Sequence, residues 1–336
     1  MGIVFLAISF GQLQAQDPHF SQFYLSPLQL NPALTGVMNE DIRASLLHRS
    51  QWRTVSAPFR TTAVSADFRG FKEYLDRDIF GLGVVVMSDK AGTADLRTTQ
   101  VQLSAAYSRA LNYEGNQFLS LGVQVGHVNQ RVDPNKLLFA SQFDGGALNP
   151  GIPSGEDIPN TALHYIDFSV GAAWSYRYNE HTSFYAGISL AHLNEPNVSF
   201  FEDEEEFLYQ RRTLYGGSEF RINSLLSMIM RGVVLSQGPA TEVSVASLLK
   251  FNFSNVNGAD DATAFYVGTM HRWRDAQTVI LRFDYGPVGL SMGYDVNFSS
   301  LRRASEGYGG MEIALLYRSA FSQSYRRSVP VRCPSF

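Results

Sequence analysis

A serine motif near the end of the chain has the spacing of a hydrolase nucleophile. Gly289-Leu-Ser-Met-Gly293 matches G-x-S-x-G, a pattern in which a sharp strand-to-helix turn presents the serine for attack. Here apolar residues continue to alternate beyond the motif, at Tyr294 and Val296, and no helical pattern follows. The motif therefore predicts part of a strand. An enzyme would need turnover that depends on Ser291 or on another nucleophile.

An acidic run offers a second type of chemistry. Glu202, Asp203, Glu204, Glu205 and Glu206 are consecutive, and carboxylate oxygens are the ligands that Ca²⁺ prefers. The run lacks both the spacing and the turn glycine of an EF-hand loop. It is therefore interpreted either as a calcium site or as a solvated loop.

Cysteine and histidine, the other residues that bind metals, are few. The single cysteine, Cys333, excludes an intramolecular disulfide and a cysteine-cluster metal site. It is either an unpaired thiol or an attachment point for a lipid or a partner. The seven histidines are scattered without an H-E-x-x-H motif, and His127 and His192 are predicted to lie at strand ends. The sequence thus predicts no catalytic residue, no cofactor and no metal.

The segments that carry these residues alternate between apolar and polar or small side chains. Such alternation, with period two, is typical of strands with one apolar and one polar face. It is clearest in three segments between Gln117 and Leu190. Their apolar positions are Leu119, Leu121, Val123 and Val125, then Ile166, Phe168, Val170, Ala172, Trp174 and Tyr176, then Phe184, Ala186, Ile188 and Leu190.

Strand length and composition predict a barrel that spans a membrane. The second segment is about twice the usual strand length of about 5–6 residues, and a strand needs roughly 9–11 residues to cross a bilayer. Charged residues make up 17% of the chain, against about 25% in typical soluble domains. No apolar run reaches the length of a transmembrane helix. The net charge of −4 does not indicate a nucleic-acid partner.

The pattern predicts an all-β, antiparallel transmembrane barrel of about 14 strands. We expect a signal peptide at 1–15, an N-terminal periplasmic or luminal plug-like segment at 16–40, the barrel at 41–320 and a tail at 321–336. The three prolines of the N-terminal segment exclude a central strand. The predicted strands are 42–50, 59–68, 79–88, 97–110, 117–131, 164–178, 182–193, 211–222, 224–237, 241–254, 263–273, 276–286, 287–298 and 311–319.

Charged residues on the polar faces predict a charged lumen. These residues either pair with one another or line a conduction path. They are Arg212, Arg231, Lys250, Arg272, Arg274 and Arg282, with Glu219, Glu242, Asp284 and Asp295.

Several short motifs and single residues follow one another along the mature chain in an order that resembles a known family. They are Phe20-Ser-Gln-Phe-Tyr24, Asn31-Pro-Ala33, Gly36, His48-Arg-Ser-Gln-Trp52, Phe59, Leu138-Phe-Ala-Ser-Gln-Phe143, Tyr165-Ile-Asp-Phe168, Gly171, Tyr294-Asp-Val296, Ser299-Ser-Leu301, Glu312-Ile-Ala-Leu315 and Val331-Arg-Cys-Pro334. In this order the chain resembles the PorP/SprF family of outer-membrane proteins, which is associated with type IX secretion and gliding motility.

The resemblance implies a non-enzymatic barrel in the bacterial outer membrane. Its implied partners are type IX secretion and motility proteins, exported cargo bound through C-terminal signal domains (adhesins included), and outer-membrane lipid. An alternative is a FadL-like transporter of hydrophobic small molecules, because Asn31-Pro-Ala33 is similar to the hatch of that class. Expected plug or partner contacts are Phe20, Phe23, Tyr24, Asn31, Pro32 and Ala33, and expected outer-loop contacts are Phe139, Phe143, Glu202, Asp203 and Glu204.

Overall fold

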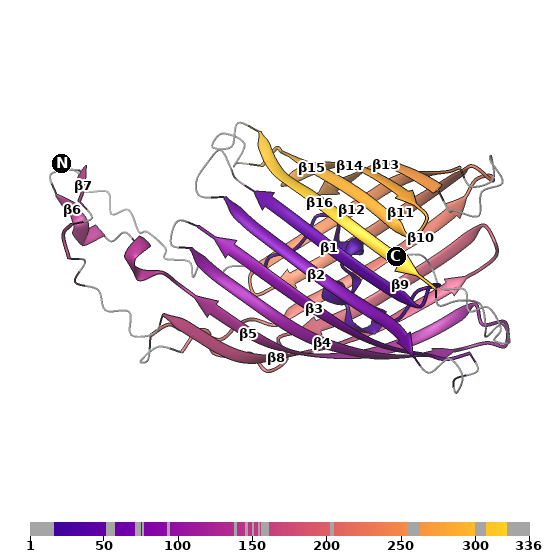
Figure 1. Cartoon of the computed structure of the whole chain (residues 1–336), viewed down its shortest axis with the longest axis horizontal. Helices are drawn as coiled ribbons and strands as arrows, with labels where there is room; N and C mark the ends of the chain where they lie inside the picture. Colours follow the sequence, from indigo (N-terminus) through magenta and orange to yellow (C-terminus); the bar gives the residue numbers. More distant parts are fainter. Residues whose placement is uncertain are drawn as a thin grey trace, which may run out of the picture.

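The chain folds into a closed antiparallel β-barrel, as a computed structural model shows (Figure 1). The structure describes residues 17–51, 58–70, 75, 77–92, 95–137, 140–144, 147–149, 151–153, 155, 161–201, 205–253, 263–299 and 307–320. In the barrel every strand pairs with its neighbours in sequence, except that β5 pairs directly with β8, and β1 closes the barrel on β16. The predicted fold class is confirmed.

Fourteen strands form the barrel wall, which is the number that the alternation predicts. The largest differences from the predicted bounds are at strand ends: the strand predicted at 79–88 continues to Ala91. The strands are β1 (Ile42–Gln51), β2 (Phe59–Gly70), β3 (Ile79–Ala91), β4 (Leu96–Ala110), β5 (Gln117–Arg131), β8 (Ala162–Arg177), β9 (Thr182–Ala191), β10 (Arg211–Arg221), β11 (Leu226–Gln237), β12 (Ala240–Asn252), β13 (Thr263–Arg272), β14 (Ala276–Tyr285), β15 (Val288–Asn297) and β16 (Tyr308–Ser319).

Outward and inward side chains alternate along each strand as the sequence predicts. In β5, Leu121 is 61% exposed on the outer face, whereas Ser120 is 2% exposed on the luminal face. In β14, Leu281 is exposed and Arg282 is buried. The apolar face thus points outward, as a wall in contact with lipid requires.

The two longest connections, 132–161 and 192–210, leave the barrel at the same end. We call it the outer end, because long loops face the outside in outer-membrane barrels. The first connection contains two short strands that the alternation did not reveal, β6 (Phe143–Asp144) and β7 (Ala147–Leu148). They pair only with each other and lie away from the barrel (Figure 1). Among the described residues, no helix is long and apolar enough to cross a membrane.

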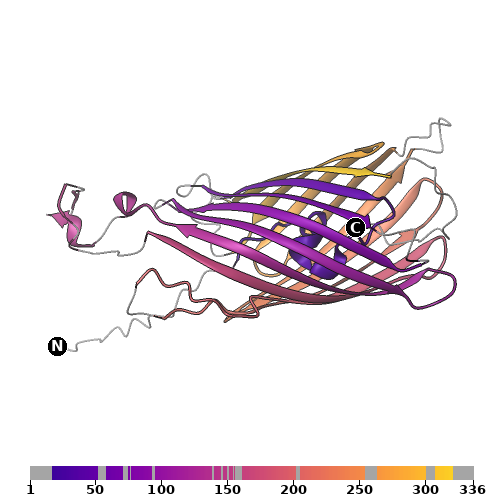
Figure 2. The same ribbon diagram turned by 60° about the horizontal axis from the view of Figure 1, so that its bottom comes forward.

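The segment before β1 lies inside the barrel (Figure 2). We call residues 17–38 the plug. It contains the 3₁₀ turn η1 (Phe23–Leu25), the single helical turn α1 (Pro27–Leu30) and the 3₁₀ turn η2 (Pro32–Leu34). Pro27 and Pro32 each occupy the first position of a turn, where a missing N–H costs nothing and the fixed φ suits a helix. The prolines therefore give this segment short turns rather than a strand.

Candidate functional site: the luminal plug

The Asn31-Pro32-Ala33 motif joins the plug to the barrel wall. The side-chain oxygen of Asn31 accepts a hydrogen bond from the Ala33 N–H at 2.8 Å and so caps η2. Its amide nitrogen donates to the carbonyls of Ala172 and Ile188, at 3.0 Å each, and to the Tyr215 hydroxyl at 3.1 Å. An asparagine fits here because one side chain supplies both the cap acceptor and donors to two adjacent strands.

Glycines in the wall make room for this motif. Gly171 of β8 faces Asn31, and a Cβ added there would lie 1.8 Å from the Asn31 Oδ1. Gly122 of β5 faces Pro32 and Ala33, and its Cβ would lie 2.4 Å from the Ala33 nitrogen. The two glycines are paired across β5 and β8. A side chain at either position would occupy space that the plug fills.

A buried ion pair holds the inner part of the plug. The guanidinium of Arg43 on β1 binds the Asp67 carboxylate on β2, with the Nη2–Oδ2 distance at 2.7 Å. The same carboxylate accepts the Gly36 N–H at 2.8 Å, and Arg43 donates to the Leu34 carbonyl at 3.1 Å. This pair is therefore part of the contact between plug and wall, and its groups are satisfied by plug main chain.

Three charged residues meet the outer end of the plug. His192, which follows β9, contacts Asp17 through Nε2 at 2.6 Å and Asp167 through Nδ1 at 2.9 Å. Arg211 binds the Asp17 carboxylate at 3.0 Å. Burial alone would lower the pKa of His192, but the charge of Asp17 and the hydrogen bonds that the imidazole donates to Asp167 and Asp17 raise this pKa to about 9. Burial would raise the pKa of Asp17, but His192 and Arg211 hold it well below its usual range.

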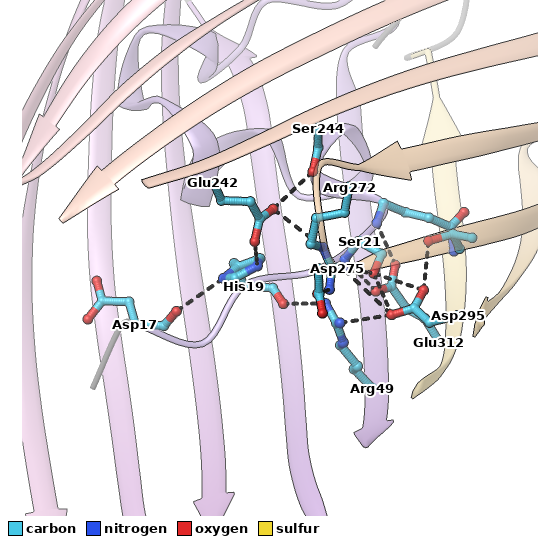
Figure 3. Close-up of polar contacts among 12 residues, drawn as sticks. Asp17, His19, Ser21, Arg49, Glu242, Ser244, Arg272, Asp275, Asp295 and Glu312 are labelled. Carbon is cyan, nitrogen blue, oxygen red and sulfur yellow. Dashed lines mark hydrogen bonds and ion pairs between the residues drawn. The ribbon is translucent and has the colours of Figure 1, made fainter. Parts of the chain in front are cut away.

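A second polar cluster surrounds the plug main chain next to this site (Figure 3). Glu312 of β16 accepts the N–H groups of Ser21 and Gln22 at 2.8 and 2.9 Å. Arg49 of β1 donates to the His19 carbonyl at 2.8 Å and pairs with Asp295 at 3.0 Å.

Further contacts complete this cluster. Arg272 of β13 donates to the Ser21 hydroxyl at 2.7 Å, and His19 contacts Glu242 of β12 at 2.7 Å. The Ser21 hydroxyl also donates to Asp295 of β15 at 3.2 Å. Five wall strands, β1, β12, β13, β15 and β16, thus hold one short stretch of plug.

The aromatic residues predicted in the plug are buried in the lumen. Phe20, Phe23 and Tyr24 are each at most 8% exposed and belong to the main apolar cluster. The Tyr24 ring lies beneath the Arg231 guanidinium, 4.0 Å from its carbon, a favourable cation–π arrangement. Asn31, Pro32 and Ala33 are buried as well. All six predicted plug residues thus contact the interior of the barrel in this structure.

The predicted outer-loop contacts fall largely outside the described residues. Phe139, Glu202, Asp203 and Glu204 are not described, nor are residues 1–16 or the tail with Cys333. Phe143 forms part of β6, where it pairs with Leu148. The structure therefore brings the plug residues together with the wall and places Phe143 in a hairpin at the outer end.

Ser291 of the G-x-S-x-G motif lies within β15, as the alternation predicts. Its side chain is fully buried and bonds to Gln22 of the plug and to the Leu281 carbonyl. Its hydroxyl thus contributes to the plug contact. Within the described ranges, no group of three or more histidine, cysteine or acidic side chains is arranged to hold a metal ion.

Most of the predicted luminal charges pair with one another. Arg282 binds Asp284 at 2.8 Å and Arg272 approaches Glu242 at 3.5 Å. The prediction is wrong for Arg212 and Arg274, which are exposed. Arg212 lies two residues before Leu214, so both side chains point to the outer face of β10. Arg274 lies in the β13–β14 turn with a positive φ of 61°.

Sequence reasoning missed the role of His192 and of the wall charges that bind the plug. His192 was predicted only at a strand end, and it is 4% exposed there. Its partners Asp17 and Asp167 are separated from it by 175 and 25 residues. The available signal was Asp167, an acidic residue on a strand face that continues with Ser169, Gly171, Ala173 and Ser175.

Solved outer-membrane channels share this fold. The toluene transporter TbuX of Ralstonia pickettii aligns with a TM-score of 0.52 and 10% identity, over 89% of this chain and 94% of that one. The toluene transporter TodX of P. putida aligns with a TM-score of 0.51 and 11% identity, over 87% of this chain and 93% of that one. The CymD monoaromatic hydrocarbon channel aligns with a TM-score of 0.50 and 11% identity, over 90% of this chain and 94% of that one. At such identities the likeness shows the fold alone.

The sequence itself identifies the family. No curated protein sequence matches the chain. Residues 12–317, however, match the family model described as type IX secretion system membrane protein PorP/SprF. With the barrel, the lipid-facing outer surface and the buried N-terminal segment, this match shows that the chain is an outer-membrane protein that belongs to the PorP/SprF family.

Proposed function

We propose that this barrel binds exported proteins and secretion machinery at the outer membrane and performs no catalysis. The observation that carries the proposal is the plug. Residues 20–28 and 30–38 of the plug are buried, and its main-chain carbonyls accept hydrogen bonds from the wall, as at Leu30 and Leu34. A lumen filled in this way suits a scaffold whose partners bind at the rims and loops.

The outer loops are the proposed contact elements for exported cargo. The connection between β9 and β10 forms a short two-stranded arm, in which Asn197 pairs with Phe207 and the Val198 N–H donates to the Glu206 carbonyl at 2.7 Å. Of the acidic run, the described residues Glu205 and Glu206 belong to this arm. The β6–β7 hairpin with Phe143 extends from the same end. Cargo would bind these elements, through its C-terminal signal domain, while the plug stays in place.

Transport of a hydrophobic small molecule is the second candidate function. It is favoured by the fold shared with the toluene transporters and by an N-terminal segment inside the lumen. The chemistry of the wall weighs against it, because a path past the plug would cross buried ion pairs such as Arg43–Asp67 and Arg49–Asp295. An apolar solute would have to displace these groups from their partners, which is costly.

Gentle detergent extraction of the tagged protein, followed by quantitative mass spectrometry, tests the proposal. We expect secretion or motility proteins and an exported protein in stoichiometric amounts. The matched variant replaces residues 198–206 with a glycine-serine linker of equal length; it should keep the heat-modifiable gel mobility of the barrel and lose the exported protein. A protein that purifies alone, with an apolar ligand in the lumen, would instead support the transporter.

A further inference from the structure

A cavity of about 60 Å³ remains in the lumen between the plug and the outer end. We call it the outer cup. One water needs about 10–15 Å³ of such space, so the outer cup holds about four waters or a group of similar size. Its wall includes Gln100 and Gln102 of β4, Gln124 of β5 and Met87 of β3, and its floor includes Phe20 and Phe23 of the plug.

Two glutamines of the outer cup make no side-chain hydrogen bond to any residue that the structure describes. Gln100 and Gln102 are 9% and 8% exposed on the luminal face of β4. Neither side-chain amide makes a hydrogen bond within the described ranges, although both line the cavity. Neither amide is among the side-chain groups that the protein seals from solvent, so both face the space of the cavity. The two amides are therefore available to a ligand in the cup that offers both donors and acceptors.

The next luminal residues along β4 and β5 show what polar side chains of this wall bind. Ser104 and Gln124 face each other across β4 and β5. Ser104 bonds to Thr35 of the plug at 2.6 Å, and Gln124 donates to the Leu28 carbonyl at 3.3 Å. Gln102 and Gln100 are the next two luminal positions toward the outer end. The wall thus continues its peptide-binding pattern one step beyond the place where the plug ends.

Gly126 leaves space beside these amides. It pairs with Gln102 across β4 and β5, and a Cβ added to Gly126 would lie 2.9 Å from the Gln102 Cγ. The Gln102 side chain therefore lies across the glycine, against the wall. This arrangement keeps the centre of the cup open.

The charges around the cup neutralise one another. Asp17 pairs with His192 and Arg211, and Asp167 pairs with His192. No charged group of the lining is left to attract an ion from solution. The ligand that fits is therefore uncharged and polar, with the hydrogen-bonding pattern of peptide groups.

We propose that the outer cup binds the tip of an uncharged polar peptide segment of an exported protein, with one or two peptide groups inside the cavity. The segment enters from the outer end, and its peptide groups bond to Gln100 and Gln102 as a continuation of the plug. Phe20 and Phe23 form an apolar floor beneath it. This inference rests on the proposed function and places one of its cargo contacts inside the barrel mouth.

The double variant Gln100→Leu/Gln102→Leu tests this site. Leucine keeps the approximate volume and removes both amides. The exported protein that co-purifies with the wild type is titrated against each purified barrel, and we expect its affinity to fall about tenfold or more, because two hydrogen bonds are lost. Gln277→Leu is the control, since Gln277 lies at the same end of β14 but bonds on the outer face to His271. It should bind like the wild type.

The outcomes separate the inference from the proposed function. If the wild type retains no exported protein, the proposed function fails. If the wild type and the double variant bind cargo equally, the function stands and the inference is overturned. If the double variant does not fold, a photo-crosslinking residue tests the site instead. At position 102 this residue should label the cargo peptide. At position 103, where Leu103 faces the lipid, it should not label the cargo peptide. Equal labelling from both positions, or labelling of this chain's own N-terminal residues alone, overturns the inference.

Discussion

Replacing Gly171 with valine should expel the middle of the plug from the lumen. The new Cβ would lie 1.8 Å from the Asn31 Oδ1, so Asn31 must retreat by about 2 Å to reach ordinary contact distance. That movement breaks the four hydrogen bonds of its side chain. The amide nitrogen has two hydrogens for its three acceptors, so the four contacts amount to about three full bonds. At about 1 kcal/mol each, the loss is about 3 kcal/mol, which raises the population of the displaced plug about a hundredfold.

Chemical labelling measures this displacement. Ser26 lies in the plug and is 2% exposed, so Ser26→Cys in a Cys333→Ser background should react slowly with a membrane-impermeant maleimide. Adding Gly171→Val should accelerate the reaction by orders of magnitude. Adding Gly232→Ala should not, because the nearest atom to a Cβ there is 3.8 Å away. Equal labelling rates in the two glycine variants, with both barrels folded, would refute the argument.

Three further changes probe the wall, the lipid face and the outer end. Asp67→Asn should destabilise the barrel by about 3–5 kcal/mol in urea titrations, because it leaves Arg43 buried and unpaired; an unchanged midpoint would contradict this. Leu281→Arg places a charge on the lipid face, so it should destabilise the folded barrel by about 2–4 kcal/mol and reduce the folded fraction on heat-modifiable gels. An unchanged folded fraction would show that the strand register is wrong. The outer end of the plug should be best protected from hydrogen exchange between about pH 4 and pH 6.5. Because the pKa of His192 is raised to about 9, its stabilisation declines above the usual histidine pKa of about 6.5 and is lost as pH rises through about 9. Because the pKa of Asp17 is lowered, its stabilisation is lost on acidification below the usual aspartate pKa of about 3.9. Constant protection at pH 10 would contradict the role of His192.

Period-two alternation predicted the barrel because each strand contacts lipid on one face only. Leu121 and Leu281 are apolar for that reason, and their neighbours Ser120 and Arg282 face the lumen. Strand ends were predicted less well, since lipid no longer dictates residue type there. Arg212 was assigned to the lumen by its charge, although its parity with Leu214 indicated the outer face.

Contacts between the plug and the wall could not be predicted, because they join residues far apart in sequence. The Asp17 carboxylate meets His192 across 175 residues, and Glu312 binds the Ser21 N–H across 291. Prolines indicated a segment that is not a strand, but no local pattern specifies which luminal carboxylate meets which main-chain group. The close approach at Gly171 is equally hidden, since glycine is also common in strands crowded by their own neighbours.

Single-channel recording of the unmodified protein in planar lipid bilayers tests the central claim, that the lumen is filled and the barrel binds rather than conducts. The account predicts that the wild type shows no stable open-pore conductance, and that Gly171→Val shows conductance steps as the plug leaves. A steady, ohmic conductance from the folded wild type, unaffected by changes at Asn31 or Gly171, would contradict it.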